Sequence, residues 1–591
     1  MDPVRIRYIK EWISQLPKGN ITYKNIRGKR YPYLQWTENG KQKNKLIKDS
    51  ELQDIIEKIE QRKSLEKKLN ESKESKLMPE VMQDKFYFSE VKTGHELSDF
   101  VKPIRSLKKR ELFSTLRDYV YGNSTDRVFI LYGLRRTGKT TLIRQVIADM
   151  PEDTFKKTAF VQITPQIDLA KINLDMRQLK KQGYRYVFID EVTLMNDFIE
   201  GAALFSDIFA SSGMKVILSG TDSLGFVFSE DQELYDRCFM LHTTFVPYRE
   251  FENVLGIKGI DEYIRYGGTM SLGGVAYNQS GMTFATKEST TEYVDSAIAK
   301  NIQHSLKNYQ DGTHFRNLAE LYEANELTSA INRIVEDITH RFTLDVLTKD
   351  FKSNDLSISA KNMLRDRNNS NDILYQIDTE TVTNQLRQLL EIRNKSEQTI
   401  DISDAHRAEI KEYLDLLDIT VDIDLVSLTD LNKKEKHTVI TQPGMRYAQA
   451  ESLIKTLMQD DIFRTLSLVE RNNITARILS EIKGRMLEDI VLLETKIAFP
   501  KYEVFKLEFA RGEFDMVVFN PEEATCAIYE IKYSTEIVES QYRHLIDEEK
   551  CAATEFRYGS ISGKYVIYRG ETCDVTDVHY LNVEEYLKGL V

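Results

Sequence analysis

Cysteine is scarce in this 591-residue chain, and its arrangement excludes two common kinds of small scaffold. Cys238, Cys526, Cys551 and Cys573 are scattered without a C-x-x-C spacing. Neither a disulfide framework nor a cysteine zinc site is therefore indicated. The nine histidines likewise form no pair with ligand spacing. This usage fits a reducing compartment, and we expect a cytoplasmic protein.

Long apolar runs are also missing from the sequence. No run of about 18 or more apolar residues occurs, so no membrane span and no membrane partner are predicted. Met1–Lys10 is charged and no apolar segment follows it. Nothing there is typical of a signal peptide.

A general excess of positive charge is absent too. The 81 Lys and Arg residues are outnumbered by 92 Asp and Glu, and the net charge of −11 argues against a basic coat for nucleic acid. The charge is unevenly spread, because residues 1–48 hold 12 Lys or Arg against three Asp or Glu. The length predicts about three to five domains.

The clearest motif lies in Val128–Met150, where an apolar strand runs into a glycine-bounded loop and then a helix-forming segment. Gly133–Thr140 fits G-x-x-x-x-G-K-[ST], whose backbone N–H groups and helix N-terminus face nucleotide phosphates. We therefore expect bound ATP, with Lys139 at its β- and γ-phosphates and Thr140 on Mg²⁺. The predicted nucleotide contacts are Gly133, Arg135, Arg136, Thr137, Gly138, Lys139, Thr140 and Thr141.

Two further strands supply polar groups for the same site. The apolar run Tyr186–Ile189 ends in Asp190 and Glu191, which would lie near the metal and near the attacking water. Lys215–Thr221 ends in small polar residues, where a γ-phosphate sensor would lie. We predict Ser219 in that role, with Thr221 in reserve.

These motifs carry a resemblance to a known family. The sequences GLRRTGKTT, the run before Asp190-Glu191, and ILSGTDS followed by Asp236-Arg237 and Phe245–Phe251 resemble the archaeal-type AAA-like ATPases of prokaryotes, over roughly residues 98–270. The resemblance implies a helical lid and an arginine, here Arg237, that acts on the γ-phosphate of its own subunit or a neighbour's. The alternative is a surface arginine paired with Asp236. The lid element Gly267–Met270 lacks the family's proline, so the lid turn can differ.

The N-terminal region alternates β-forming and polar residues over 19–47, with turn signals, and predicts a small β-meander. Its aromatic and basic residues suit stacking and phosphate contacts with DNA, or else the aromatics form the sheet's own core. These residues are Tyr23, Tyr31, Tyr33 and Trp36 with Lys24, Arg27, Lys29, Arg30, Lys41 and Lys43. Residues 50–76 predict a charged connecting helix, and a short coiled coil that forms a homo-oligomer is the alternative.

The middle of the chain predicts a lid and a second module. Residues 247–354 are mostly helical in pattern, and 355–403 read as a polar connector. Residues 404–441 follow the order helix, strand, turn, strand, which is the order of a winged helix. Such a module binds DNA or packs against a lid, and we favour packing.

The last hundred residues hold a second set of charged residues. A helix at Gly484–Lys496 carries Glu488, and strands follow that carry Asp515 and then Glu530-Ile531-Lys532. Asp515 and Glu530 would hold Mg²⁺, Lys532 would orient or activate the attacking water, and Glu488 could add a carboxylate. The bare spacing is a weak signal, and the order of elements strengthens it.

This order resembles the PD-(D/E)xK nuclease domain that many of these ATPases carry at the C-terminus. Gly512–Asp515 departs from the pattern by placing Glu513 close to Asp515, and no proline precedes Asp515. Gln541 and Tyr542 match the place of a helix that would contact DNA, with ordinary surface residues as the alternative.

Together these features predict a multidomain α/β protein. Its expected parts are a basic β-meander (1–48), a charged helix and linker (49–97), a P-loop ATPase core (98–246), a helical lid and connector (247–403), a winged-helix-like segment (404–480) and an α/β restriction-endonuclease-like domain (481–591). We expect that the nucleotide state controls a metal-dependent DNA nuclease, in defence against foreign DNA. The alternative is a nucleotide switch whose C-terminal domain binds DNA or docks protein without cutting.

Overall fold

The computed structural model divides the chain into two compact units, residues 1–87 and 88–591, each described here by itself. Apart from single residues, the structure describes 16–26, 29–38, 41–48, 54–56, 58–60 and 62–63 in the first unit, and 88–195, 198–221, 234–243, 245–270, 286–308, 315–347, 402–429, 434–463 and 466–590 in the second.

The first unit contains the expected meander. Strands β1 (Asn20–Ile26), β2 (Lys29–Glu38) and β3 (Lys41–Leu46) pair antiparallel in that order. Arg62, in the helical segment that follows, donates hydrogen bonds to the carbonyl oxygens of Ile13 (2.5 Å) and Leu16 (2.7 Å). The helix is therefore tied back to the segment before the sheet. Most of the predicted linker lies outside the described residues, and the coiled coil stays a prediction.

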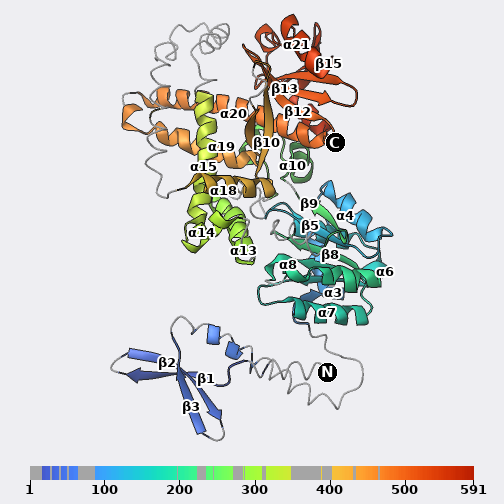
Figure 1. Cartoon of the computed structure of the whole chain (residues 1–591), viewed down its shortest axis with the longest axis vertical. Helices are drawn as coiled ribbons and strands as arrows, with labels where there is room; N and C mark the ends of the chain where they lie inside the picture. Colours follow the sequence, from blue (N-terminus) through green and yellow to red (C-terminus); the bar gives the residue numbers. More distant parts are fainter. Residues whose placement is uncertain are drawn as a thin grey trace. The chain divides into compact units, whose positions relative to one another are not determined.

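The ATPase core of the second unit is a six-stranded sheet (Figure 1). In spatial order its strands are β4 (Glu90–Lys92), β6 (Thr158–Gln162), β7 (Tyr186–Asp190), β8 (Lys215–Gly220), β5 (Val128–Tyr132) and β9 (Cys238–His242). All are parallel except the edge strand β4. Because β5 lies between β8 and β9, the loops after β5, β7 and β8 meet at one edge, where open parallel sheets bind ligands.

Helices cover this sheet because apolar side chains point from the strands to both faces. On one face Phe129 and Leu131 of β5 pack with α3, α4 and α5. The helices of the core are α3 (Gly94–Val101), η3 (Lys102–Ile104), α4 (Leu112–Tyr121), α5 (Lys139–Ala148), α6 (Glu152–Phe155), α7 (Leu169–Lys181), η4 (Val192–Leu194), α8 (Phe198–Gly201), η5 (Phe205–Phe209) and η6 (Ala210–Ser212).

The expected helical region follows the core. Its helices are α10 (Tyr248–Leu255), α11 (Ile260–Tyr266), α12 (Lys287–Tyr293), η8 (Val294–Ala299), α13 (Lys300–Asn308), α14 (Arg316–Glu323) and α15 (Leu327–Asp345). Helices α18 (Asp404–Leu416) and α19 (Pro443–Leu457) follow in the segment predicted to be winged-helix-like. Nearly all of the predicted connector 355–403 lies outside the described residues.

The C-terminal sheet corrects the expectation of a separate winged-helix module. Its eight strands lie in the order β11 (Lys434–Ile440), β10 (Thr420–Ser427), β12 (Glu503–Glu508), β13 (Glu513–Asn520), β14 (Thr525–Ile531), β15 (Ser560–Tyr568), β17 (Val578–Asn582) and β16 (Cys573–Val575). The β10–β11 hairpin pairs with β12 through parallel hydrogen bonds between β10 and β12. An edge strand with free backbone groups is stabilised by such pairing, so the hairpin extends the C-terminal sheet.

The predicted boundary at residue 480 is also wrong, because it falls inside the 31-residue helix α20 (Leu468–Ala498). Ser467 and Glu470 form a capping box at the start of this helix. The helix therefore begins well before Gly484, where the sequence pattern predicts its start. At Gly484, α20 passes close to the Tyr533 side chain. The remaining helices are η11 (Asp461–Phe463), η12 (Glu539–Gln541), α21 (Glu548–Tyr558) and α22 (Val583–Gly589).

None of the helices that the structure describes is long and apolar enough to cross a membrane.

Candidate nucleotide site and C-terminal carboxylate site

The loop between β5 and α5 has the geometry of a phosphate cradle. Gly133 (φ 135°) and Gly138 (φ 92°) adopt backbone conformations that favour glycine. A Cβ atom at Gly133 would lie 2.5 Å from the carbonyl oxygen of Thr243, so only glycine fits there. Gly138 immediately precedes α5, whose first N–H groups face the loop.

Lys139 closes the loop from inside. Its Nζ donates to the carbonyl oxygens of Gly133 and Leu134, both at 2.7 Å. Burial lowers the pKa of Lys139 to about 8, although the Glu191 and Asp190 carboxylates act in the opposite direction. The ammonium group is thus held where it can exchange carbonyl oxygens for phosphate oxygens.

Thr140 and Asp190 meet as the sequence predicts. The Thr140 hydroxyl donates to Asp190 Oδ2 at 2.8 Å, across 50 residues of sequence. A hydroxyl and a carboxylate side by side at a cradle are oxygen donors that suit Mg²⁺, and they would hold the ion together with the nucleotide phosphates.

Glu191 lies next to this pair in a left-handed backbone conformation (φ 59°), which is unusual outside glycine and often marks functional sites. Burial and the neighbouring Asp190 raise the pKa of Glu191, and Thr221 Oγ1 donates to Glu191 Oε2 at 3.2 Å. Ser219 Oγ is fully buried and has no hydrogen-bond partner among the described residues. Thr221 both donates to Glu191 and lines the cleft described below, so the choice of Ser219 over Thr221 as the γ-phosphate sensor stays a prediction.

A cleft of about 350 Å³ opens beside these groups. Its lining includes Arg135 of the loop, Thr221, and Lys300 and Asn301 of α13. Asn301 Nδ2 donates to the carbonyl oxygen of Thr221 at 2.6 Å, so the lid reaches the catalytic edge. Two cations therefore line a cleft large enough for phosphate groups and water.

The structure shows other contacts for two of the remaining loop residues, and their predicted contacts with the nucleotide stay predictions. The Arg136 guanidinium lies 5.7 Å from the centre of the Tyr293 ring, toward the lid. Thr137 is buried and its hydroxyl donates to the Leu134 carbonyl oxygen at 2.8 Å. The role of Thr141 stays a prediction.

Arg110 is a residue that the sequence reasoning missed. Its side chain is 5% exposed and pairs with Glu250 of α10, which is 3% exposed, at 2.5 Å. Arg110 Nη1 also donates to the Thr137 carbonyl oxygen at 2.8 Å. The sequence motif Phe245–Phe251 contains Glu250, but no local feature of the sequence predicts that its partner is Arg110, 140 residues away.

The structure corrects the expectation for Arg237 within its own subunit. The Arg237 carbonyl oxygen accepts a hydrogen bond from Val128 N (3.0 Å), at the start of β5 and thus at the edge opposite the P-loop. Its side chain pairs with Asp207 (3.5 Å), and Asp236 pairs with Arg127 (2.5 Å) instead. The reason is that β9 runs parallel to β5, which places the residues before β9 far from the phosphates. Action on a neighbouring subunit stays a prediction.

The C-terminal residues Asp515, Glu530 and Lys532 come together at the ends of β13 and β14. Lys532 Nζ lies 2.8 Å from Asp515 Oδ2 and 2.6 Å from Glu530 Oε2. Burial lowers the pKa of Lys532, but the two carboxylates more than offset it and hold this pKa well above its ordinary value. Burial and Asp515 raise the pKa of Glu530 well above its ordinary value.

In this structure Glu488 is paired with two cationic side chains, and its role as a metal ligand stays a prediction. Its carboxylate is held by Lys506 and Arg485, each at 2.8 Å. Among the described residues, no group of three or more Asp, Glu, His or Cys side chains could hold a metal. The expected three-carboxylate set is therefore not assembled, because the buried Lys506, unnoticed in the sequence, neutralises Glu488.

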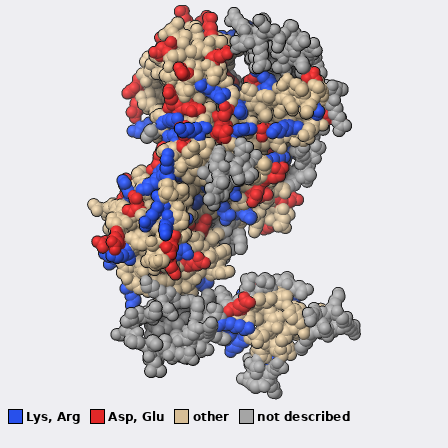
Figure 2. All heavy atoms as spheres, turned by 180° about the vertical axis from the view of Figure 1, so that it is seen from behind, with Lys and Arg blue, Asp and Glu red and all other residues tan. Residues whose placement is uncertain are grey.

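Two expectations for DNA contacts have different outcomes. Gln541 is buried in the short turn η12 and its amide donates to the Glu536 carbonyl oxygen (3.0 Å), so it is not a surface helix residue. In the first unit, Tyr23 (55%) and Tyr31 (38%) are exposed, which leaves their rings available for stacking. In the second unit, Figure 2 shows acidic and basic side chains interspersed on the visible face, without one continuous basic surface.

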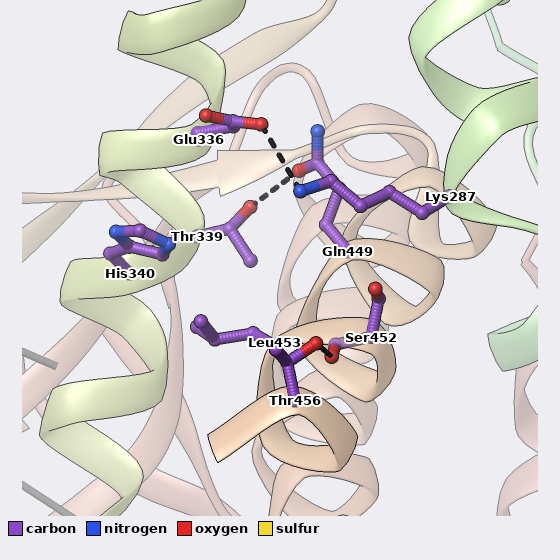
Figure 3. Close-up of a pocket in the computed structure, with 8 residues that line it drawn as sticks. All are labelled: Lys287, Glu336, Thr339, His340, Gln449, Ser452, Leu453 and Thr456. Atoms are coloured by element: carbon purple, nitrogen blue, oxygen red, sulfur yellow. Dashed lines mark hydrogen bonds and ion pairs between the residues drawn. The ribbon is translucent and has the colours of Figure 1, made fainter. Parts of the chain in front are cut away.

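A further pocket lies between α15 and α19, with Lys287 of α12 at its side (Figure 3). Its volume is only about 30 Å³. Lys287 pairs with Glu336 (3.6 Å), and Thr339 donates to Gln449 (2.8 Å). Such a space has room for about one or two water molecules.

Comparison with family models identifies two regions. Residues 125–252 match an AAA domain, and residues 3–71 match a domain of unknown function, DUF6788. The first match contains the P-loop, Asp190, Glu191 and Ser219, so the chain contains an AAA-type nucleotide-binding ATPase domain. The second match extends across the domain boundary predicted after residue 48. It thus includes both the meander and the helix after it.

No curated protein matches the chain. Similar solved structures include S. cerevisiae Hsp104 with casein (13% identity, 27% of this chain and 31% of that chain, TM-score 0.22), Aeropyrum pernix Orc1 with DNA (13%, 61% and 93%, 0.21) and a katanin structure (10%, 56% and 92%, 0.17). The chain spans less than a third of the Hsp104 chain. TM-scores of this size carry no argument about this protein.

Proposed function

We propose that this chain hydrolyses ATP and that its nucleotide state controls a magnesium-dependent DNA nuclease in the C-terminal domain, in defence against foreign DNA. The observation that supports nuclease activity is the contact of Lys532 with the buried carboxylates of Asp515 and Glu530. Side chains of this kind at adjacent strand ends suit the hydrolysis of a phosphodiester.

The ATP chemistry follows from the residues around the P-loop. Lys139 and the loop N–H groups bind the β- and γ-phosphates, and Thr140 and Asp190 would hold Mg²⁺. Glu191, held by Thr221, lies where it can orient the attacking water. Ser219 Oγ, free of protein partners among the described residues, can donate to the γ-phosphate.

The order of elements around Asp515 supports the nuclease. Helix α20 is followed by the antiparallel strands β12, β13 and β14, then by α21, and then by β15, which runs parallel to β14. The carboxylates of Asp515 and Glu530 thus project from neighbouring central strands, as the resemblance implies.

The residues present also fit a metal ion. Glu530 Oε1 is buried without a hydrogen-bond partner in the described part of the chain. Mg²⁺ is commonly bound through one or two carboxylates together with substrate phosphates, so Asp515 and Glu530 would suffice. A bound ion would polarise the phosphate and favour ionisation of a water.

Lys532 would orient or activate the attacking water. Its ammonium group lies 2.8 Å from Asp515 Oδ2 and 2.6 Å from Glu530 Oε2, and it would also stabilise the charge that develops on a bound phosphate.

A second candidate is a nucleotide switch whose C-terminal domain does not cut. The observation that favours it is that each of the three acidic side chains pairs with a cationic side chain. Lys532 bridges Asp515 and Glu530, while Lys506 and Arg485 hold Glu488. Ion pairs of this kind also occur in structural ion clusters.

Incubation of the protein with supercoiled and linear DNA, Mg²⁺ and ATP tests the proposal. We expect cleavage by the wild type, none by Glu530→Ala or Lys532→Ala, and wild-type cleavage by Asp577→Ala. Asp577 is a suitable control because its carboxylate, in the same domain, is 80% exposed and pairs only at the surface with Lys564. Intact DNA with every protein would support the switch.

A further inference from the structure

Asp261 of α11 contacts the segment that follows Lys532. Asp261 Oδ1 accepts hydrogen bonds from Lys483 Nζ (2.9 Å) and from the Tyr533 hydroxyl, and Oδ2 accepts one from Arg569 Nη2 (2.5 Å). The three donors come from α20, from the end of β14 and from the end of β15. A single carboxylate of the helical region therefore joins three elements of the C-terminal domain.

Tyr533 and Lys532 lie on opposite faces of the same strand end. Successive side chains of a strand alternate between faces, and Ile531 and Tyr533 pack in the cluster formed with α20. Lys532 points the other way, to Asp515 and Glu530. A contact that holds Tyr533 in place thus also holds the backbone of Lys532.

The backbone hydrogen bonds extend this pairing beyond β14. Lys532 N donates to the Ile567 carbonyl oxygen (2.8 Å), and Arg569 N donates to the Ser534 carbonyl oxygen (2.9 Å). The Arg569 guanidinium lies 4.4 Å from the centre of the Tyr533 ring. Tyr533 and Arg569 therefore form one side-chain pair across two adjacent strand ends, with Asp261 bound to both.

The other end of this region reaches the nucleotide site. Helix α10 precedes α11 and carries Glu250, which pairs with Arg110 and through it contacts the Thr137 carbonyl oxygen in the P-loop. The backbone N–H of Tyr248, at the start of α10, donates to Glu494 Oε1 of α20 (2.8 Å). The α10–α11 region thus contacts the C-terminal domain directly and the P-loop through Arg110.

We propose that Asp261 is a positioning residue for the C-terminal site. By holding Tyr533 and Arg569, it fixes the strand end that presents Lys532 to Asp515 and Glu530, and it transmits the state of the P-loop to that strand end. The inference rests on the proposed function, because it names the residue through which the nucleotide controls cleavage.

The test compares Asp261→Asn with Asp574→Asn in the full-length protein. Asparagine keeps the size of the side chain and removes its charge. Asp574 is an apt control because it lies on β16 of the same sheet and has an exposed ion pair with His579. We expect kcat for Mg²⁺-dependent DNA cleavage to fall about 10- to 100-fold in Asp261→Asn, since small displacements of reacting groups cost rates of this order. ATP hydrolysis and the Asp574→Asn rate stay near wild type.

Tyr533→Phe removes only the hydroxyl and gives a second, milder variant. If Tyr533 acts through Asp261, the double variant should cleave about as slowly as Asp261→Asn alone, because coupled residues are not additive. If the double variant cleaves more slowly than Asp261→Asn by the full factor measured for Tyr533→Phe alone, Tyr533 does not act through Asp261.

Hydrogen exchange of residues 529–536 provides a readout that does not depend on cleavage. We expect faster exchange in Asp261→Asn, and loss of the change that ATP produces in the wild type. If Asp261→Asn cuts DNA at the wild-type rate while Lys532→Ala does not cut, the positioning role is wrong and the proposed function stands. If the wild type does not cut, the proposed function fails, and exchange alone decides: equal exchange in the two proteins overturns the inference, and faster exchange in the variant supports it.

Discussion

Glu250→Gln removes the charge from a buried ion pair beside the nucleotide site. Glu250 accepts three hydrogen bonds, from Arg110 Nε (2.7 Å) and Nη2 (2.5 Å) and from Glu111 N (2.7 Å). Breaking a buried pair by removing one partner typically costs about 3–5 kcal/mol, because the other charge stays buried and uncompensated. Glutamine still accepts one hydrogen bond, so we expect a loss near the lower end of this range.

The same substitution should weaken nucleotide binding. Arg110 Nη1 donates to the Thr137 carbonyl oxygen in the P-loop, and that contact depends on the position of the guanidinium. The appropriate measurements are the thermal transition with and without ATP and the titration of a fluorescent ATP analogue.

Glu111→Gln is a matched control, because Glu111 is adjacent to Arg110 and its 51% exposed carboxylate pairs with Arg249. Exposed pairs are typically worth about 0–1 kcal/mol, so this variant should behave almost as wild type. Replacement of both Arg110 and Glu250 by Met should restore much of the stability but not the ATP affinity. Equal melting and equal ATP affinity in Glu250→Gln and Glu111→Gln would refute the reasoning.

Three further predictions concern other parts of the chain. Lys139→Ala should lose ATP affinity. In the wild type, ATP affinity should fall as pH rises through about 8, where Lys139 loses its charge, and this pH dependence should be absent from Lys139→Ala. Glu191→Gln should bind ATP and hydrolyse it slowly. Hydrolysis at the wild-type rate by Glu191→Gln would exclude it as the group that orients water. Burial raises the pKa of Glu494 to about 7, so the folded state takes up a proton that the unfolded state lacks, and wild-type stability should fall between about pH 4.5 and 7. The melting temperature of Glu494→Gln, relative to that of the wild type, should therefore rise from pH 5 to pH 8. A difference in melting temperature that does not change with pH would contradict the assignment. Removal of residues 1–48, with a net excess of nine positive charges (12 minus 3), should leave ATP hydrolysis intact and make the slope of log K for DNA against log[salt] shallower by about 4 if roughly five charges meet phosphates. Equal slopes in fluorescence anisotropy on one duplex would return this segment to a purely structural role.

The elements with strong local patterns were predictable from the sequence alone. The apolar run of β7 ends at Asp190 as predicted. The P-loop was predictable because a glycine-bounded turn between a strand and a helix is specified by residues close in sequence. The contact of Thr140 with Asp190 followed from the chemistry that this motif requires.

The tertiary structure decided which distant groups meet. Helix α20 crosses the predicted boundary and the β10–β11 hairpin joins the C-terminal sheet, because strand edges are satisfied by partners that local periodicity does not specify. The direction of β9 placed Arg237 at the edge away from the phosphates.

Buried charges show most clearly what the sequence determines and what the tertiary structure decides. The sequence by itself determined the local elements and the chemistry of the P-loop, since both depend on neighbouring residues. Only the tertiary structure decided the partners of Arg110, Lys506 and Asp261, which lie 140, 18 and up to 308 residues away. A buried charge must be paired, but its partner can come from any element that packs against it, so the pairing depends on how the whole chain folds.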